Sequence, residues 1–194
     1  MTFKQLTQRI RVPAGFVLAP LLFVSARPSP SSLAAGAFVA VIGLAIRAWA
    51  SGHLKKNQEL AMSGPYAHTR NPLYLGTFLL GMGVAIGGGT LWFIVVFAAV
   101  YLLIYFPVML AEADTMRGLF ADEYKAYSRE VPLFVPRFTP YGAHGKHSYA
   151  AQLKRRLWRS GPRFDLSLYM RHREYRAALG FAVIYVLLAT KMFL

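Results

Sequence analysis

Hydrophobic residues are gathered along the chain into long runs, and short polar stretches separate these runs. A helix needs about 20 residues to cross a lipid bilayer. Four runs approach or reach this length: residues 33–50, 73–88, 91–110 and 178–194. A fifth run, residues 12–26, is shorter and contains Pro13 and Pro20. We interpret it as a first, kinked span; the alternative is the core of a signal peptide, although no clear cleavage pattern precedes Arg27.

This pattern predicts an all-α fold, a polytopic membrane bundle of about five transmembrane helices. Of the 194 residues, 56% are hydrophobic and 14% are aromatic, which is too apolar for an ordinary soluble domain. The chain divides into three parts. Residues 1–50 hold two spans, residues 51–140 hold a polar stretch, a hairpin of two spans and a tail, and residues 141–194 hold a basic segment and the last span.

The net charge of +14 raises the question of a nucleic-acid partner. The basic residues, however, lie before the first span, after the second, and between the fourth and the fifth. Only Arg27 and Lys191 fall on the other side. This alternation satisfies the positive-inside rule if the N-terminus is cytoplasmic and the outer turns are residues 27–32 and 88–90. We therefore expect an integral protein of the cytoplasmic membrane and no nucleic-acid partner.

Several chemistries are excluded or disfavoured by composition. The chain has no cysteine, so it has no disulfide, thiol nucleophile or thiolate ligand. His53, His144, His147 and His172 lack the spacing of metal ligands, so we expect no metal site and interpret these histidines as solvated or interfacial. We expect Arg47, near the inner end of the second span, to snorkel to the interface. Residues 148–160 predict either a basic amphipathic helix on an anionic leaflet or a solvated positive loop.

One polar stretch, SGPYAHTRNPLYLG at residues 63–76, stands at the start of the third span. Glu112 stands at the end of the fourth span, and the turn between the two spans is short. The two ends are therefore neighbours. Because polar groups at membrane depth are costly, we interpret the polar residues at these two helix ends as functional. The topology predicts a cytoplasmic pocket walled by Arg70, Asn71, Tyr74 and Glu112.

A helical stripe of apolar and aromatic residues continues beyond the fourth span into the cytoplasm. It consists of Met116, Phe120, Tyr124 and Tyr127. Pro132 and Pro136 then end the helix and predict an extended, docked tail. The two tyrosines of the stripe can either pack the tail or line a bound aromatic ring.

These two regions together resemble a known family. The pattern Gly-Pro-Tyr-x3-Arg-Asn-Pro-x-Tyr-x-Gly, a hairpin, and then Glu-x3-Met-x3-Phe-x3-Tyr-x2-Tyr-x3-Val-Pro-x3-Pro is similar to the core of the isoprenylcysteine carboxyl methyltransferases. Those enzymes belong to a wider group of membrane methyltransferases that includes phospholipid N-methyltransferases. The resemblance covers about residues 53–140. It implies transfer of a methyl group from S-adenosylmethionine to a hydrophobic or lipid-like acceptor at the cytoplasmic membrane face.

The resemblance also implies site residues. Contacts with S-adenosylmethionine are expected from Leu60, Ala61, Tyr66, Asn71, Pro72, Leu73, Tyr74 and Glu112. Catalytic contributions are expected from Arg70, Asn71 and Tyr74, with no general base assigned. A cofactor with an ammonium, a carboxylate and an adenine needs a carboxylate, cationic donors and aromatic faces, which these residues supply. Gly81-Met82-Gly83 resembles a Gly-x-Gly of the phospholipid enzymes, although helix packing more often explains such glycines.

The chain departs from the family pattern at four positions. Ala113 replaces the second of two paired glutamates, Asn71 replaces a histidine, and Ala121 replaces a glycine. Val108 replaces an arginine that faces the substrate carboxylate in the isoprenylcysteine enzymes. An apolar residue at that position favours a neutral or cationic acceptor.

Two other functions are kept as alternatives. One is a sterol-reductase-like membrane reductase that uses NADPH, although such proteins usually carry more spans. The other is a non-enzymatic lipid-binding protein that has retained the fold. The acceptor itself is open, and a phospholipid amine, an isoprenoid, a quinone-like phenol, a fatty acid or a small hydrophobic molecule would each suit the resemblance.

Overall fold

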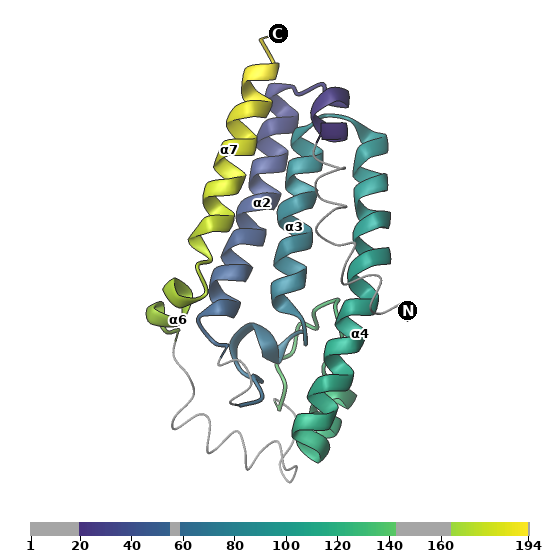
Figure 1. Ribbon diagram of the computed structural model, residues 1–194, viewed down its shortest axis with the longest axis vertical. Coiled ribbons are helices and arrows are strands. Elements are labelled where there is room, and N and C mark those ends of the chain that lie inside the picture. Colours follow the sequence, from purple (N-terminus) through teal and green to yellow (C-terminus); the bar gives the residue numbers. More distant parts are fainter. Residues whose placement is uncertain (1–19, 55–58, 143–163, 194) are drawn as a thin grey trace. The chain divides into compact units, whose positions relative to one another are not determined.

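The computed structural model describes residues 20–54, 59–142 and 164–193 of the chain, and every regular element in these residues is helical. Residues 20–25 form a short helix that carries no label. The helices labelled in Figure 1 are α2 (Pro30–Ser51), α3 (Pro72–Gly87), α4 (Leu91–Glu130), α6 (Leu166–Arg171) and α7 (Tyr175–Lys191), and a 3₁₀ helix, η1 (Gly64–Ala67), precedes α3. The predicted all-α class is confirmed for the described residues.

The predicted spans agree closely with the helices. Residues 33–50, 73–88 and 178–194 correspond to α2, α3 and α7, and residues 91–110 form the first half of the 40-residue helix α4. Within the described residues, α2 and α4 are long and apolar enough to cross a membrane, whereas the apolar helix α3 has only 16 residues. The number of five spans and their orientation stay predictions. Most of the first span, and the basic segment 148–160, lie outside the described residues.

Short polar motifs start two of these helices. Ser29 precedes Pro30, and its hydroxyl accepts a hydrogen bond from the Ser32 backbone N–H at 3.1 Å. This is the usual serine cap followed by a proline in the first helical position. Helix α3 also begins at a proline, Pro72, directly after Asn71, whose backbone carbonyl accepts from Leu75 N at 3.0 Å. The Asn-Pro pair therefore fixes where the polar stretch ends and the apolar helix begins.

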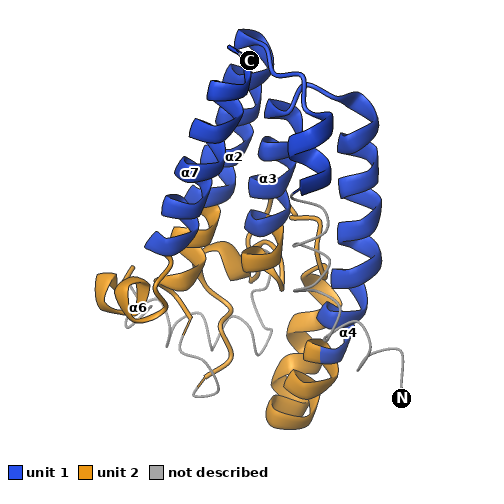
Figure 2. Cartoon of the chain, turned by 45° about the horizontal axis from the view of Figure 1, so that its top comes forward, with its two compact units in different colours: residues 1–45, 76–111, 175–194 blue, residues 46–75, 112–174 orange. Residues whose placement is uncertain are grey.

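The chain forms two compact units (Figure 2). Unit 1 comprises residues 1–45, 76–111 and 175–194, and unit 2 comprises residues 46–75 and 112–174. In unit 1, helices α2 and α3 touch backbone to backbone. A Cβ atom on Gly83 would lie 2.5 Å from Gly36 O and 2.6 Å from Ala40 N, so these positions have no room for a larger residue.

The glycines of α3 thus serve helix packing, which is the more common explanation of the Gly-x-Gly pattern. Besides the contact of Gly83 with α2, the ring of Phe97 from α4 packs directly on Gly81. Tyr185 of α7 completes the group, since its hydroxyl lies 3.1 Å from Leu33 O and 3.3 Å from Gly83 O.

The two turns predicted for the outer side lie together at one end of unit 1. Arg27 N donates to Gly88 O at 2.8 Å, and Thr90 Oγ1 donates to Ser25 O at 2.9 Å. The ammonium of Lys191, the other basic residue predicted for that side, donates to Val24 O at 2.9 Å. The predicted grouping of these segments is confirmed, while the side of the membrane on which they lie stays a prediction.

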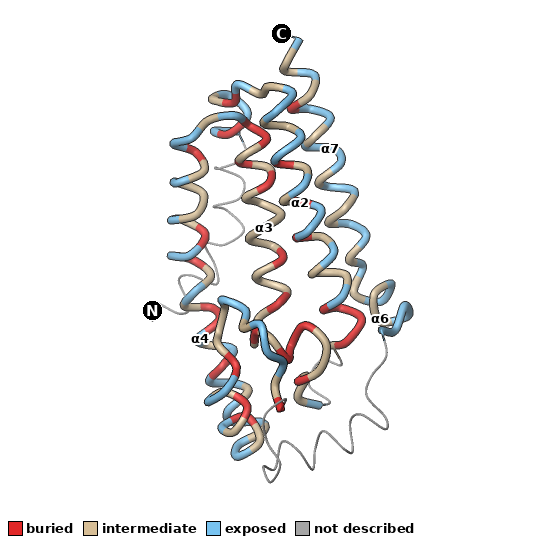
Figure 3. The backbone as a smooth tube through the Cα atoms, turned by 180° about the vertical axis from the view of Figure 1, so that it is seen from behind, coloured by how far each residue is buried: buried red, intermediate tan, exposed pale blue. Residues whose placement is uncertain are grey.

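Many large apolar residues of unit 1 are exposed, and Figure 3 shows exposed positions alternating with buried or intermediate ones along α2, α4 and α7. Soluble domains seldom expose so much apolar surface in contiguous patches. Outward apolar faces therefore agree with association with a membrane. Examples are Phe38, Val41, Val95, Leu103, Val183 and Val186, all more than half exposed.

Helix α4 is interrupted in unit 2, where the sequence pattern predicts a continuous stripe. Phe120 and Ala121 have non-helical backbone angles, and Ala121 has φ +23° and ψ −104°. Positive φ favours glycine, because a Cβ atom is poorly tolerated there. Ala121 is the position at which the resembling family has a glycine, but the helical period of the stripe predicted no break there.

Candidate functional site

The tail after helix α4 is docked on the polar stretch, as predicted. Tail residues 132–141 and residues 67–70 are joined by backbone hydrogen bonds, as segments outside helices require when they leave water. These bonds are Arg70 N to Pro132 O (3.0 Å), Arg137 N to His68 O (2.9 Å) and Tyr141 N to Ala67 O (2.9 Å). Both segments belong to unit 2.

Side chains of the polar stretch fasten the same tail. The hydroxyl of the buried Thr69 lies 3.0 Å from Phe134 O and 3.3 Å from Leu133 O. The amide Nδ2 of Asn71 donates to Leu133 O at 2.9 Å. Asn71 therefore holds the tail in the structure, and its predicted catalytic contribution stays a prediction.

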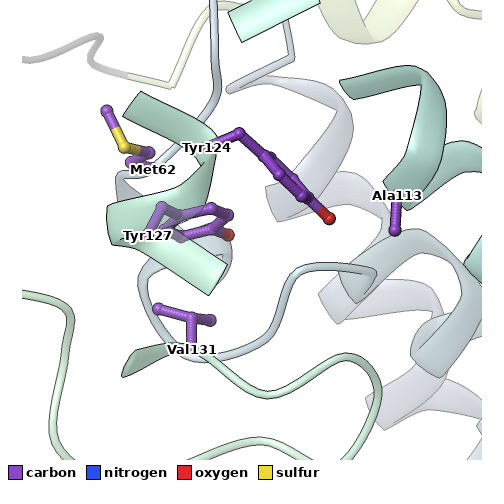
Figure 4. Packing of buried hydrophobic residues seen from close by; sticks show 5 residues of the cluster. All are labelled: Met62, Ala113, Tyr124, Tyr127 and Val131. Carbon is purple, nitrogen blue, oxygen red and sulfur yellow. The ribbon is translucent and has the colours of Figure 1, made fainter. Parts of the chain in front are cut away.

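A buried apolar cluster lies beneath these segments (Figure 4). It consists of Met62, Ala113, Tyr124, Tyr127 and Val131. The Tyr127 hydroxyl donates to Tyr66 O at 2.6 Å, so the end of α4 is tied to η1. Ala113 is 8% exposed in this cluster. A glutamate there would place a carboxylate among apolar groups, which explains why an apolar residue occupies the position of the family's second glutamate.

The phenols of Tyr66 and Tyr127 are kept neutral. Burial raises the pKa of Tyr127 above its ordinary value. Burial also raises the pKa of Tyr66, and the carboxylates of Glu112 and Glu174 raise it further. A buried phenol with a raised pKa remains protonated at physiological pH. Tyr127 thus packs the tail, one of the two roles considered for it.

The guanidinium of Arg70 has one nitrogen that makes a hydrogen bond and one buried nitrogen without a partner among the described residues. Its Nη1 lies 3.0 Å from the Tyr124 hydroxyl, and its guanidinium carbon lies 5.8 Å from the centre of the same ring. Its Nε is buried and has no hydrogen-bond partner among the described residues. Leaving a buried charged donor unpaired costs about 1–3 kcal/mol or more. The Arg70 Nε is therefore a donor suited to an anionic ligand group.

Tyr74 and Glu112 are in direct contact. The Tyr74 hydroxyl donates to Glu112 Oε1 at 2.7 Å, although the two residues are 38 positions apart and lie on α3 and α4. The predicted neighbourhood of the polar stretch and the end of the fourth span is confirmed by this bond. The carboxylate is exposed and fixed by a charge-assisted hydrogen bond.

The other predicted cofactor residues lie around this contact with different burial. Leu60 packs against the apolar cluster, and Pro72 is fully buried at the start of α3. Ala61 and Leu73 are half-buried. Their contacts with a cofactor stay predictions, as does the pocket.

Two single residues have partners that the sequence did not predict. Arg47 Nε and Nη2 bind Glu174 Oε2 at 3.0 and 2.7 Å, and its position at the membrane interface stays a prediction. His53 is buried, so the solvated alternative considered for it was wrong; its Nδ1 lies 2.9 Å from Trp49 O, and its ring packs on Gly64. Glu174 was not singled out by the sequence. The available signal was its rarity, since it is one of two acidic residues in the basic segment 141–177.

Comparison with known proteins adds the family. Residues 34–123 match the family described as phospholipid methyltransferase. The cobalt-zinc-cadmium resistance protein CzcN of Cupriavidus metallidurans is 32% identical over 138 residues, which cover 68% of this chain and 63% of that protein. The nickel-cobalt-cadmium resistance protein NccN of Alcaligenes xylosoxydans xylosoxydans is 27% identical over 106 residues, which cover 54% of this chain and 48% of that protein.

The chain thus spans less than two thirds of the length of either relative. No solved structure matches it. The matched range includes the polar stretch, helix α3 and Glu112, and it ends before the last part of the motif on which the resemblance rested. Residues 34–123 therefore carry a phospholipid methyltransferase domain, which is of the isoprenylcysteine carboxyl methyltransferase and phospholipid methyltransferase type of membrane methyltransferases.

Proposed function

We propose that this protein is an integral-membrane methyltransferase that uses S-adenosylmethionine and methylates a hydrophobic or lipid-like acceptor at the cytoplasmic face. The observation that carries the proposal is the Tyr74–Glu112 hydrogen bond of 2.7 Å inside the family-matched residues. It joins the Glu112 carboxylate to Tyr74, four residues after Arg70, whose Nε has no hydrogen-bond partner among the described residues.

The residues present fit the cofactor. The exposed Glu112 carboxylate would bind its ammonium group, and Arg70 Nε would donate to its carboxylate. Tyr74 would hold the Glu112 carboxylate in place. S-adenosylmethionine, when bound, supplies a methyl group on a sulfonium, which is a good leaving group.

The protein's own contribution would be alignment and exclusion of water. Positioning two reactants can account for about 7–11 kcal/mol of a barrier. Thr69 and Asn71 serve this purpose by fixing the tail on the polar stretch. The neutral Tyr66 and Tyr127 phenols contribute packing and hydrogen bonds rather than a base. The identity of any base depends on whether the acceptor loses a proton.

The acceptor would be neutral or cationic. Val108 occupies the position at which the isoprenylcysteine enzymes have an arginine, and its side chain is only 2% exposed. A buried valine cannot pair with a carboxylate. Carboxyl methylation of a prenylated cysteine is therefore disfavoured.

Ligand binding tests the proposal. Calorimetric titration of the purified full-length protein with S-adenosylhomocysteine should give saturable binding. The Glu112→Gln variant should lose at least about tenfold in affinity, because one charge-assisted hydrogen bond contributes about 1.5–3 kcal/mol. Glu123→Gln, a carboxylate on the same helix with no assigned role, is the matched control and should bind normally. Binding of NADPH without S-adenosylhomocysteine would instead support the reductase alternative.

The names of the relatives favour a second, compatible role in resistance to cobalt, zinc and cadmium. Cells lacking the gene would then grow poorly with these metals. If methylation underlies resistance, wild-type protein should restore growth and the Glu112→Gln variant should not. Restoration by both proteins would support the non-enzymatic alternative.

Transfer of tritium from labelled S-adenosylmethionine into a total lipid extract would identify the acceptor class.

A further inference from the structure

One edge of the Arg70 guanidinium is left without a partner in the described residues. Nη1 donates to the Tyr124 hydroxyl at 3.0 Å, and Nε is buried without a hydrogen bond. None of the ion pairs in the part of the chain that the structure describes includes Arg70. In a planar guanidinium, Nε and Nη2 share one edge, which can donate to two oxygens of the same carboxylate or phosphate. Arg70 therefore offers this edge to an anion.

Tyr124 fixes the orientation of that guanidinium. The tyrosine lies after the break in α4 and is 3% exposed in the apolar cluster of Figure 4. Its ring lies 6.2 Å from the ring of Tyr127, in an edge-on arrangement, and 5.8 Å from the guanidinium carbon of Arg70. A cation at this distance from an aromatic ring is attracted to it. The hydroxyl and the ring of a buried side chain thus both hold Arg70.

The same tyrosine lies beside the part of α4 that carries Glu112. Tyr124 and Ala113 belong to one buried cluster, and Figure 4 shows the hydroxyl end of Tyr124 directed towards Ala113. Ala113 directly follows Glu112, whose carboxylate accepts a hydrogen bond from Tyr74 at 2.7 Å. The amino-acid end of the proposed cofactor carries an ammonium and a carboxylate on one carbon, so it needs an acceptor and donors close together. Tyr124 contacts the donor, Arg70, and the residue next to the acceptor, Glu112.

We propose that Tyr124 is a positioning residue of the cofactor site, which holds Nη1 of Arg70 so that the Nε–Nη2 edge faces the carboxylate of S-adenosylmethionine. This inference rests on the proposed function. Tyr124 acts through Arg70 and contacts no reacting atom. The protein should therefore distinguish ligands that have the carboxylate from ligands that lack it, and this preference should depend on the Tyr124 hydroxyl.

Two ligands that differ only in the carboxylate test the inference. They are S-adenosylhomocysteine and its decarboxylated analogue, and their dissociation constants are measured by calorimetry on the full-length protein. The wild type should bind S-adenosylhomocysteine at least about tenfold more tightly, because only this ligand can pair with the Arg70 edge. Tyr124→Phe should weaken S-adenosylhomocysteine about three- to tenfold, less than full loss of the pairing, and change the analogue less than about twofold. Equal weakening of both ligands, or no change in either, would overturn the inference.

A second tyrosine of the same cluster separates orientation from stability. Tyr127→Phe removes the hydrogen bond to Tyr66 O, which does not involve Arg70. It should lower the thermal unfolding midpoint and keep the wild-type preference between the two ligands. Loss of the preference in this variant as well would overturn the inference, because general loosening of the cluster would then explain the result.

Combining variants tests whether Tyr124 acts through Arg70. Arg70→Lys keeps the positive charge but lacks the planar edge, so it should lose most of the preference for the carboxylate. Adding Tyr124→Phe to Arg70→Lys should then reduce the preference no further, since residues that act through one contact are not additive. Full additivity of the two substitutions, or an unchanged preference in Arg70→Lys, would contradict the proposed role.

The Arg70 edge also suits the phosphate of a phospholipid. If Tyr124→Phe weakened binding of dihexanoylphosphatidylethanolamine and of neither nucleoside ligand, the edge would serve the acceptor and the inference would be overturned. Failure of the wild type to bind either nucleoside ligand would instead reject the proposed function itself.

Discussion

The two units of the molecule differ in the interactions that stabilise each of them. In unit 1, small residues let helix backbones touch, as Gly36 and Gly83 do. In unit 2, segments without regular structure are joined by backbone hydrogen bonds and by buried tyrosines such as Tyr127. Non-helical backbone must find partners when it leaves water. The polar groups that make a site are therefore concentrated where the chain leaves the helix.

The largest effect should come from filling the close contact in unit 1. Gly83→Leu would force α2 and α3 apart, because even a Cβ atom would lie 2.5 Å from Gly36 O. We expect a loss of about 3 kcal/mol or more in the free energy of unfolding, the upper end for overpacking. Denaturant unfolding in detergent micelles would measure it. Gly180→Ala is the control, since a Cβ there would meet nothing within 4 Å, and it should be neutral or stabilising.

The next effect concerns unit 2 and its hydrogen bonds. Tyr127→Phe removes the donor to Tyr66 O, a buried bond of 2.6 Å. The expected loss is about 1–3 kcal/mol, because the carbonyl would stay buried without its partner. Tyr175→Phe, at an exposed tyrosine, should change stability by less than about 0.5 kcal/mol. Equal effects of the two substitutions would contradict the assigned role of Tyr127.

The stability of the protein at alkaline pH should reveal the contribution of the buried tyrosines, which titrate, separately from that of apolar packing, which does not. The pKa values of Tyr66 and Tyr127 are raised in the folded protein, so the folded state retains protons that the unfolded state releases above its ordinary pKa of about 10. The stabilisation that comes from these raised pKa values is complete below about pH 10. It is lost as the pH rises towards the pKa values of the folded state. Stability should fall by about 1.4 kcal/mol per pH unit for each tyrosine. Tyr127→Phe should reduce that slope, as unfolding measured between pH 9 and about 12 would show.

The smallest expected effect is an increase in the free energy of unfolding. Ala121→Gly should stabilise the protein by up to about 1 kcal/mol, because glycine accepts the backbone angles of this position without strain. Gly118→Ala is a matched test three residues earlier, where a Cβ would meet nothing within 4 Å. This substitution should also stabilise the protein, because alanine has a higher helix propensity than glycine. Destabilisation by Ala121→Gly would mean that the break in α4 has another cause.

Much of this comparison could be predicted from the sequence. Apolar runs predicted α2, α3 and α7 because the helices of unit 1 are built from continuous hydrophobic segments. The contact of Tyr74 with Glu112 followed from the short turn between two spans. Both predictions depend on local pattern and chain connectivity, which a single sequence contains.

What could not be predicted depends on single residues that meet across the chain. The Arg47–Glu174 pair joins positions 127 residues apart and has no surrounding pattern. The burial of His53 depends on the shape of the loop at Gly64. The break at Ala121 was also missed, because apolar residues continue with helical spacing on both sides of it.

The backbone contact of α2 with α3 also has a consequence for the proposed lipid-like acceptor. Where Gly36 meets Gly83, the two helices are too close for a hydrocarbon chain to pass between them. If the proposed acceptor enters laterally from the bilayer, its acyl or isoprenoid tail would have to pass between other helices. A bulkier residue at either glycine would separate α2 from α3 and open this boundary to a hydrocarbon chain.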